Sequence, residues 1–329
     1  MEKKYLGEFR SNCALKRFPG NPILSFEDVP YKSMLVFNAG VAKYQNKYVM
    51  VFRNDYGSFE EQSIEGTNLG LAISDDGITW EVQPEPCFSH ANEDVLHVND
   101  PRLTVIDEKC YVTLAMISRS GVRGAIAMTD NFQHFEILHE TLPDNRNLVL
   151  FPEKINNKYV RLERPFANYL RVHRDRFDIW LSESPDLIHW GNSRLVLSAA
   201  EVPFCNDKVG PGTPPIKTDK GWVTIFHSVD VDPDRGKQGW EEKWDKRYTA
   251  GAMLLELENP SKIIGFSKEP ILVPEAVYEI ENGFRNNVIF PCGAVLEENA
   301  EVKIYYGAAD TVECLAFIDI EDLIKSCLE

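Results

Sequence analysis

The 329-residue sequence lacks long hydrophobic runs: no window approaches the roughly 18 uninterrupted apolar residues that a membrane-spanning helix needs. The N-terminal stretch MEKKYLGEFRSNC has no apolar region of the kind found in a secretory signal peptide. Positive charge is also scarce, with 35 Lys and Arg against 51 Asp and Glu and a formal net charge of −16. The long-range field of such a protein repels polyanions, which argues against a general binder of nucleic acid or anionic membranes. It does not exclude a small anion held by a few focused basic side chains.

Paired cysteine motifs are absent as well. The seven cysteines are odd in number, scattered and never in CxxC spacing, at positions 13, 87, 110, 205, 292, 314 and 327. We expect reduced thiols in a cytoplasmic protein, without a zinc site or any other metal site. The glycine- and proline-rich segment 210–215 does not match GxxxxGK[ST], so it does not indicate a nucleotide-binding P-loop. We expect a stiff turn there that lets the backbone approach a ligand.

Long amphipathic helical patterns are scarce, and no low-complexity linker divides the chain, so residues 1–329 are expected to form one domain. Short runs rich in β-branched and aromatic residues recur instead between Gly, Asn, Asp and Pro, which is typical of an all-β protein. The clearest are NKYVMVFR (46–53), KCYVTLAM (109–116), NKYVRLER (157–164), KGWVTIFH (220–227) and EVKIYYGA (301–308).

Each of these runs follows a shorter apolar run and a polar turn, and each precedes a third run. Aligning them gives spacings of 63, 48, 63 and 81 residues between Tyr48, Tyr111, Tyr159, Trp222 and Lys303. Five units of this length, each with about four strands, predict a five-bladed β-propeller. A β-sandwich with coincidental similarity between its strands is the alternative.

The repeat also predicts a site, because equivalent positions in propeller blades converge near one axis. Five residues beyond the aligned positions lie Arg53, Met116, Arg164, His227 and Ala308. Polar residues open the first run of each unit, at Asn38, Asp100, Arg146, Lys208 and Asn287. Arginine forks match phosphate oxygens and lysine supplies a point charge. The set therefore indicates an anion site, although any one of these residues alone would be interpreted as part of a surface salt bridge.

Asp100 stands in HVNDPRLT (97–104), directly before a proline. Because Pro101 disfavours the helical region for the preceding residue, we expect a rigid, extended segment that presents the carboxylate. A carboxylate held near cationic side chains suits a general acid for cleavage of a glycosidic bond. Asp-Pro is also a common turn initiator, and that structural interpretation stays open.

The motifs resemble, in content and order, those of glycoside hydrolase family 130. They are FNAGV…VFR, NDPR, NRNLVLFPEKI, RLERP, DIWLSESPDLIHWG, KxGxGxPPI, GWVTIFH, YxAGAMLLELENPSK and FPCGAV…IYYGAADT. The resemblance runs from about Arg17 to Leu323. It implies an inverting β-mannoside phosphorylase or a related mannosidase, and a five-bladed propeller in agreement with the repeat.

The resemblance also implies a role for each candidate residue. Asp100 matches the catalytic carboxylate of the family, which protonates the glycosidic oxygen through a hydroxyl of the bound mannose. The phosphate-binding positions are matched by Arg146, Arg164, Lys208 and His227. Motifs that line the sugar subsites contain Asn38, Arg53, Tyr248 and Asp310. The expected substrates are a β-mannosyl oligosaccharide and inorganic phosphate, without a cofactor, and a homo-oligomer is compatible with the sequence.

The basic set favours phosphorolysis over hydrolysis. An inverting hydrolase needs a second carboxylate to deprotonate water, whereas phosphate is already a charged nucleophile that must only be held in line with the anomeric carbon. We therefore expect α-mannose 1-phosphate as product. An inverting β-mannosidase and a non-catalytic carbohydrate-binding propeller are the alternatives, and the positioned acid disfavours the second.

Some features remain open in the sequence. The charged loop 239–247 is either a solvated insertion or a lid that stacks sugar rings. His173 is more typical of a surface residue, but it could border the acceptor subsite. The sequence leaves undetermined whether the linkage is β-1,4 or β-1,2 and which acceptor sugar is released.

Overall fold

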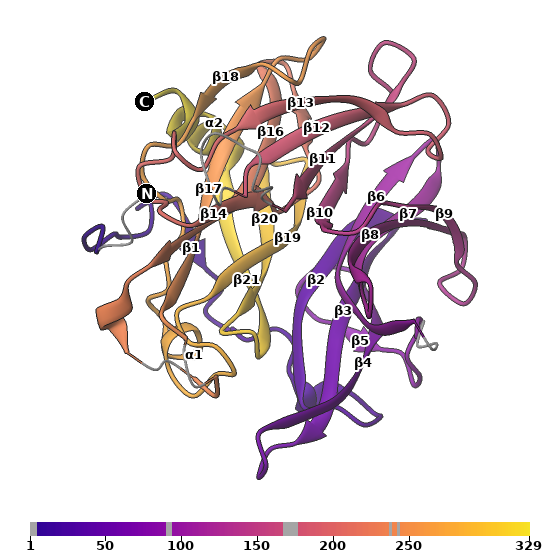
Figure 1. Cartoon of the computed structure of the whole chain (residues 1–329), viewed down its shortest axis with the longest axis vertical. Coiled ribbons are helices and arrows are strands. Elements are labelled where there is room, and N and C mark those ends of the chain that lie inside the picture. The colour runs from indigo at the N-terminus through magenta and orange to yellow at the C-terminus, as the bar shows by residue number, and fades with distance from the viewer. Residues whose placement is uncertain (1–4, 90–93, 167–176, 237–238, 242–243) are drawn as a thin grey trace.

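The computed structural model describes residues 5–89, 94–166, 177–236, 239–241 and 244–329. They form five antiparallel sheets arranged as a five-bladed β-propeller, which confirms the predicted all-β class (Figure 1). Blades 1 and 2, in indigo to magenta, lie on one side in Figure 1, and blades 4 and 5, in orange to yellow, lie on the other. None of the helices in these ranges is long and apolar enough to cross a membrane.

The blades follow one another along the chain. Blade 1 consists of β2 (Leu35–Tyr44), β3 (Lys47–Ser58), β4 (Ser63–Ser74) and β5 (Glu81–Val82). Blade 2 consists of β6 (Val95–Ile106), β7 (Lys109–Ser118), β8 (Gly121–Thr129) and β9 (Glu136–Glu140). Blade 3 consists of β10 (Asn145–Leu150), β11 (Tyr159–Pro165), β12 (Ile179–Ser184) and β13 (Gly191–Leu197). Blade 4 consists of β14 (Lys208–Pro211), β15 (Ile216–Thr218), β16 (Gly221–Val231), β17 (Lys246–Leu255) and β18 (Ile263–Phe266).

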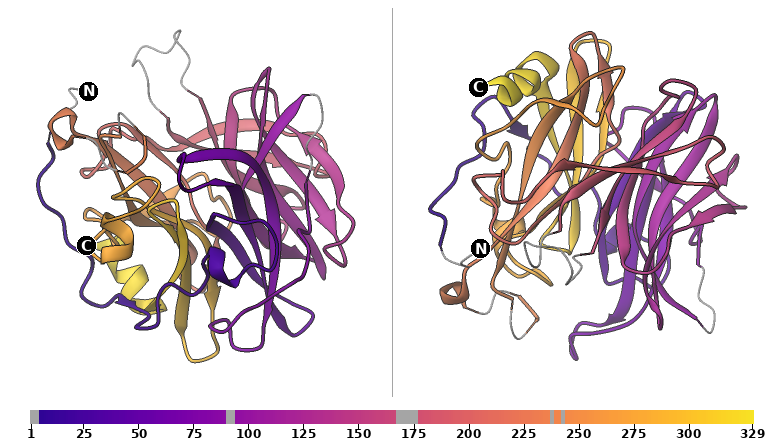
Figure 2. Two further views of the ribbon diagram at one scale, coloured as in Figure 1. Left: turned by 90° about the horizontal axis from the view of Figure 1, so that it is seen from below. Right: turned by 45° about the horizontal axis from the view of Figure 1, so that its top comes forward.

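Blade 5 joins the two ends of the chain. It consists of β19 (Ile289–Leu296), β20 (Glu301–Ala308), β21 (Val312–Asp319) and the N-terminal β1 (Lys16–Arg17). Helix α2 (Ile320–Leu328) follows β21 and packs against blade 4 with an apolar face (Figure 2). The other helical elements are α1 (Val277–Ile280) and two 3-10 turns, Phe26–Asp28 and Pro233–Arg235. Pairing between β1 and β21 thus closes the ring of blades.

The five runs aligned in the sequence are the second strands of the blades, β3, β7, β11, β16 and β20. These strands are buried along most of their length, and β16 is buried throughout. Their apolar residues pack between neighbouring blades, as Ile225 of β16 and Ile304 of β20 do in one shared cluster. The spacing was detectable because burial between two blades makes many residues of each such strand apolar, although β11 also buries Arg161 and Glu163.

The first strands of blades 1, 2 and 3 share a β-bulge that the sequence analysis did not predict. The register shifts between Phe37 and Gly40, between Asn99 and Arg102, and between Arg146 and Val149. Each bulge contains a residue with positive φ: Asn38 (56°), Asp100 (52°) and Asn147 (57°). Asn and Asp tolerate this left-handed conformation better than most residues, and a bulge re-aims the side chain it carries.

The prediction that Asp100 lies in a regular extended segment is therefore wrong in its local geometry. Asp100 is inside strand β6, but its own backbone is left-handed, because the bulge inserts extra residues opposite β7. The restriction imposed by Pro101 excludes the right-handed helical region and leaves this alternative.

Candidate active site

A cavity of about 80 Å³ lies where the inner ends of the five blades meet. Its lining residues are Asn38, Arg53, Asp100, Arg146, Asn147, Arg164, Lys208, Tyr248, Arg285, Val288, Phe290 and Asp310. Eight of the nine candidate residues therefore line the cavity. The ninth, His227, is not in its lining. Small-molecule sites are typically roughly 300–1,000 Å³, so the space bounded by the described residues suits a small anion or one end of a larger ligand.

Asp100 is one of the two carboxylates that line the cavity, and it is 2% exposed. Its Oδ1 accepts a hydrogen bond from Asn38 Nδ2 at 2.9 Å, and its Oδ2 pairs with Arg146 Nη2 at 2.5 Å. Arg53 Nη1 lies 3.8 Å from Oδ1. Burial alone would raise the pKa of Asp100, but the charges of Arg146, Arg53 and Arg102 and the amide of Asn38 hold it well below its usual range.

Three cations face the same space. Arg146 and Arg164 are directly opposite each other in the β10–β11 pair, an arrangement that is unfavourable for like charges. Burial, together with the charge of Arg146, lowers the pKa of Arg164 to about 9. Burial and the charge of Arg164 lower the pKa of Lys208 to about 7. This mutual repulsion is relieved by an anion bound between the three side chains.

His227 supports this cluster from behind and is fully buried. Its Nε2 lies 3.0 Å from Arg164 Nη1. Because a guanidinium group only donates, Nε2 must accept, so the imidazole is neutral. Burial and the charge of Arg164 keep the pKa of His227 well below its usual range. His227 therefore orients Arg164, and it does not add a positive charge for an anion.

The glycine-rich segment 210–215 packs against the same buried side chains, His227 and Arg164. A Cβ at Gly210 would lie 2.6 Å from His227 Nε2 and 3.1 Å from Arg164 Cδ. The carbonyl of Gly212 accepts a hydrogen bond from Arg102 Nε at 2.9 Å. Residues 210 and 211 of the segment thus belong to strand β14, where Gly210 leaves room for buried side chains, and residues 212–215 connect β14 to β15.

Arg285 was missed by the sequence analysis. It lies in the connection before β19, outside the aligned strands, so the repeat gave no signal for it. Its Nη1 pairs with Asp310 Oδ2 at 3.0 Å, and its Nε donates to Glu241 Oε1 at 2.8 Å. Burial raises the pKa of Asp310, although Arg285 and Arg53 act against this shift.

The described residues of the loop 239–247 pack against the protein and do not form a solvated insertion. Trp240 packs edge-on against Phe284 at 5.5 Å between ring centroids. Trp244 is buried and stacks on Tyr248 at 5.8 Å with an interplanar angle of 11°. Trp244 thus supports the cavity wall through Tyr248, whereas Trp240 packs on Phe284, which is not in the lining. Residues 242–243 of this loop and His173 lie outside the described residues.

At three positions the repeat predicted a residue near the axis that does not line the cavity. Met116, Ala308 and Asn287 are not in the cavity lining, and blade 5 contributes Val288 and Phe290. Conversely, Asn147 lines the cavity from the bulge of β10, which had no candidate in the sequence analysis beyond its neighbour Arg146. Within the described ranges, no three His, Cys, Asp or Glu side chains gather as a metal site would require.

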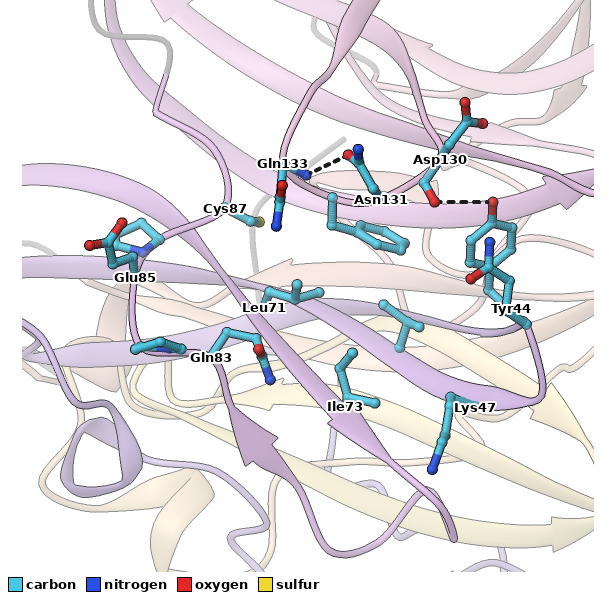
Figure 3. A pocket seen from close by; sticks show the side chains of 15 residues that line it. Tyr44, Lys47, Leu71, Ile73, Gln83, Glu85, Cys87, Asp130, Asn131 and Gln133 are labelled. Carbon is cyan, nitrogen blue, oxygen red and sulfur yellow. Dashed lines mark hydrogen bonds between the residues drawn. The ribbon is translucent and has the colours of Figure 1, made fainter.

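A wider hollow of about 590 Å³ lies on the rim between blades 1 and 2 (Figure 3). Its floor is apolar, with Leu71 and Ile73, and its edges carry Gln83, Asn131 and Gln133. It contains none of the candidate residues and no cluster of cations, so the axial cavity is the better candidate site.

The comparisons with known proteins agree with this geometry. The family model described as beta-1,4-mannooligosaccharide phosphorylase, glycoside hydrolase family 130, matches residues 15–329. A 1,2-beta-oligomannan phosphorylase of Thermoanaerobacter sp. is 32% identical, covering 94% of this chain and 98% of its own. A beta-1,4-mannooligosaccharide phosphorylase of Ruminococcus albus is 31% identical, covering 94% of this chain and 89% of its own.

Among solved structures, the beta-1,2-mannobiose phosphorylase of Listeria innocua in complex with beta-1,2-mannobiose superposes with a TM-score of 0.81. It is 27% identical and covers 95% of this chain and 99% of its own. The match of the family model over almost the whole chain, the relatives above 30% identity and the shared propeller agree with the motif order. The chain belongs to glycoside hydrolase family 130 and is an enzyme of the glycoside phosphorylase type.

Proposed function

We propose that this enzyme cleaves a β-mannosyl linkage with inorganic phosphate and releases α-mannose 1-phosphate. The observation that carries the proposal is the convergence of Arg146, Arg164 and Lys208 on one side of a buried, hydrogen-bonded Asp100. Asp100 acts as the general acid, and the three cations hold phosphate. The family match and the phosphorylase names of the relatives support the same reaction.

Phosphate binding prepares the acid. In the free site, Asp100 is held as a carboxylate by its pairing with Arg146. A bound phosphate takes over part of the charge of Arg146 and adds negative charge nearby, and both effects raise the pKa of Asp100. Asp100 then takes up a proton from solvent, passes it on to the leaving oxygen during the reaction, and is a carboxylate again when the products leave.

The bonds formed and broken in the reaction balance without a general base from the protein. A phosphate oxygen attacks the anomeric carbon on the face opposite the leaving group, and the glycosidic C–O bond breaks. Through a hydroxyl of the mannosyl residue, the proton of Asp100 passes to the leaving oxygen, which departs as the free acceptor sugar. We assign the mannosyl ring to Asn38, Arg53, Tyr248 and Asp310, and their presence in the cavity lining supports this assignment.

A hydrolytic mechanism would need a second carboxylate free to activate water. Asp310 is the other carboxylate in the lining, and it is paired with Arg285 at 3.0 Å. Although burial raises the pKa of Asp310, Arg285 occupies its Oδ2, so this oxygen is not free to take a proton from water. The geometry therefore favours phosphate as the nucleophile.

The decisive experiment incubates the enzyme with β-1,2-mannobiose, β-1,4-mannobiose and 4-O-β-mannosylglucose, each with and without phosphate. Phosphorus NMR should show α-mannose 1-phosphate from at least one of them, and turnover should cease without phosphate. Free mannose formed at the same rate in phosphate-free buffer would establish hydrolysis instead. Relatives with β-1,2 and β-1,4 linkages in their names are 32% and 31% identical, so the panel also assigns the linkage.

The pKa of Lys208 predicts how anion affinity changes with pH. Its pKa of about 7 in the free site means that the amine loses its charge as the pH rises above 7. Sulfate stays doubly charged over this range, so its inhibition constant against phosphate should rise by about fifteenfold between pH 7 and 8.5. In Lys208→Arg the constant should stay nearly flat. An equal slope in both proteins would show that another group controls anion binding.

We place the reaction in the cytoplasm, where phosphate is abundant and a sugar phosphate is retained. The thiols support this, because all seven cysteines are free in the structure. Disulfides form and persist mainly in oxidising compartments.

A further inference from the structure

Glu313 is a buried carboxyl group that no step of the proposed reaction uses. It lies in β21 of blade 5 and is 0% exposed. Its backbone N–H donates to Leu24 O at 3.0 Å, so its main chain holds the N-terminal segment. Its side chain reaches in the other direction, to β2 of blade 1, the strand that neighbours β21 (Figure 1).

The contact made by this side chain falls on the bulge of β2. Glu313 Oε2 accepts a hydrogen bond from the backbone N–H of Ala39 at 3.1 Å. Ala39 directly follows Asn38, the residue with φ of 56° whose amide donates to Asp100 Oδ1. The carboxyl group therefore holds the backbone at the point that aims Asn38 at the acid.

The packing around Asn38 leaves it little freedom. Gly307 lies beneath its side chain, and a Cβ there would overlap Asn38 Oδ1. Gly40 lets the bulges of blades 1 and 2 interlock, because a Cβ at that position would lie 2.6 Å from Arg102 Cα. The hydrogen bond that the Ala39 N–H donates to Glu313 fixes the backbone orientation within this packing.

Glu313 differs from the other buried carboxyl group of this region in the partners it has. Glu279, another wholly buried carboxyl of this region, is neutralised by Arg17 at 2.8 Å and accepts from Tyr306 OH at 2.9 Å. Glu313 has no cationic partner among the described residues, and burial raises its pKa well above its usual range. An apolar side chain of similar size would leave the buried Ala39 N–H without an acceptor, so this hydrogen bond to the bulge is what the carboxyl group contributes.

We propose that Glu313 is a positioning residue for the general acid, acting through the bulge at Asn38 and Ala39. Its hydrogen bond keeps the Asn38 amide on Asp100, and it touches neither phosphate nor sugar. This inference rests on the proposed role of Asp100.

Two variants of equal length test it. Glu313→Gln retains an oxygen for the Ala39 N–H, whereas Glu313→Met has similar volume without a strong acceptor. We expect Gln to keep kcat within about threefold, and Met to lower kcat by at least tenfold while the phosphate KM changes by less than threefold. Glu279→Gln is the control: it should lower the melting temperature without changing kcat at a temperature where it is folded. Equal kcat values for the Gln and Met variants would overturn the proposal.

A double-mutant cycle with Asn38→Ala identifies the route of the effect. If Glu313 acts through Asn38, the Met substitution should lower kcat by less than twofold once Asn38 is already Ala. Additive losses would show that Glu313 stabilises the fold by another path. Should Glu313→Met fail to fold, Glu313→Asp takes its place in the same cycle, because it keeps the carboxyl group but withdraws it from the Ala39 N–H. If Asp100→Asn stays active, the proposed function itself fails, whatever the outcome of this cycle.

Discussion

Asp100→Asn is expected to lower kcat by about 10²–10⁴-fold, the usual contribution of general acid–base catalysis. The amide keeps the shape of the carboxylate and its contact with Asn38, but it has no proton of suitable acidity for the leaving oxygen. The phosphate KM should stay the same or fall, because the substitution removes a negative charge beside Arg146. Steady-state rates with both substrates varied measure the two effects separately.

Two controls accompany this substitution. Losing the partner of a buried ion pair can destabilise a protein by about 3–5 kcal/mol, so melting curves should be recorded with phosphate present. Asp178→Asn removes another buried carboxylate, one that accepts the Ala199 N–H at 2.8 Å and does not line the cavity. It should leave kcat unchanged. A loss of less than about tenfold in Asp100→Asn would remove Asp100 from the role of acid.

The propeller was predictable because the same pattern of burial recurs in the second strand of every blade. Each second strand is packed between blades, so it reads as an apolar run at every recurrence, from Val49 in blade 1 to Ile304 in blade 5. The convergence of Arg53 and Arg164 followed from the same repeat, since both occupy equivalent strand positions. Runs of apolar residues that result from burial can be recognised in a single sequence.

The parts that were missed depend on register and on contacts between distant segments. The bulge that turns Asp100 is a shift of pairing between β6 and β7, and the alternation of residue types does not encode it. Arg285 enters the cavity from a connecting segment, where no repeat applies. The neutral state of His227 follows from its burial and from the guanidinium group of Arg164 beside it, which lies 63 positions earlier in the chain.

Arg164→Ala should give the largest change in phosphate affinity. Charge-assisted hydrogen bonds contribute about 1.5–3 kcal/mol each, which corresponds to roughly 10–150-fold at about 1.4 kcal/mol per decade. The phosphate KM should therefore rise by at least tenfold, while the KM for the mannoside changes little, because Arg164 belongs to the cationic side of the cavity. The free protein itself should tolerate the loss, since the substitution relieves the repulsion between Arg164 and Arg146.

Arg161→Ala is the matched control on the same strand. Arg161 is buried like Arg164, but it pairs with Glu163 at 2.9 Å and does not line the cavity. Its removal leaves a buried carboxylate unpaired, so the melting temperature should fall while the phosphate KM stays within about threefold. The two variants thus separate anion binding from general loss of a buried arginine. Equal rises in the KM for phosphate and for the mannoside in Arg164→Ala would mean that the cation only supports the fold, and that phosphate binds elsewhere.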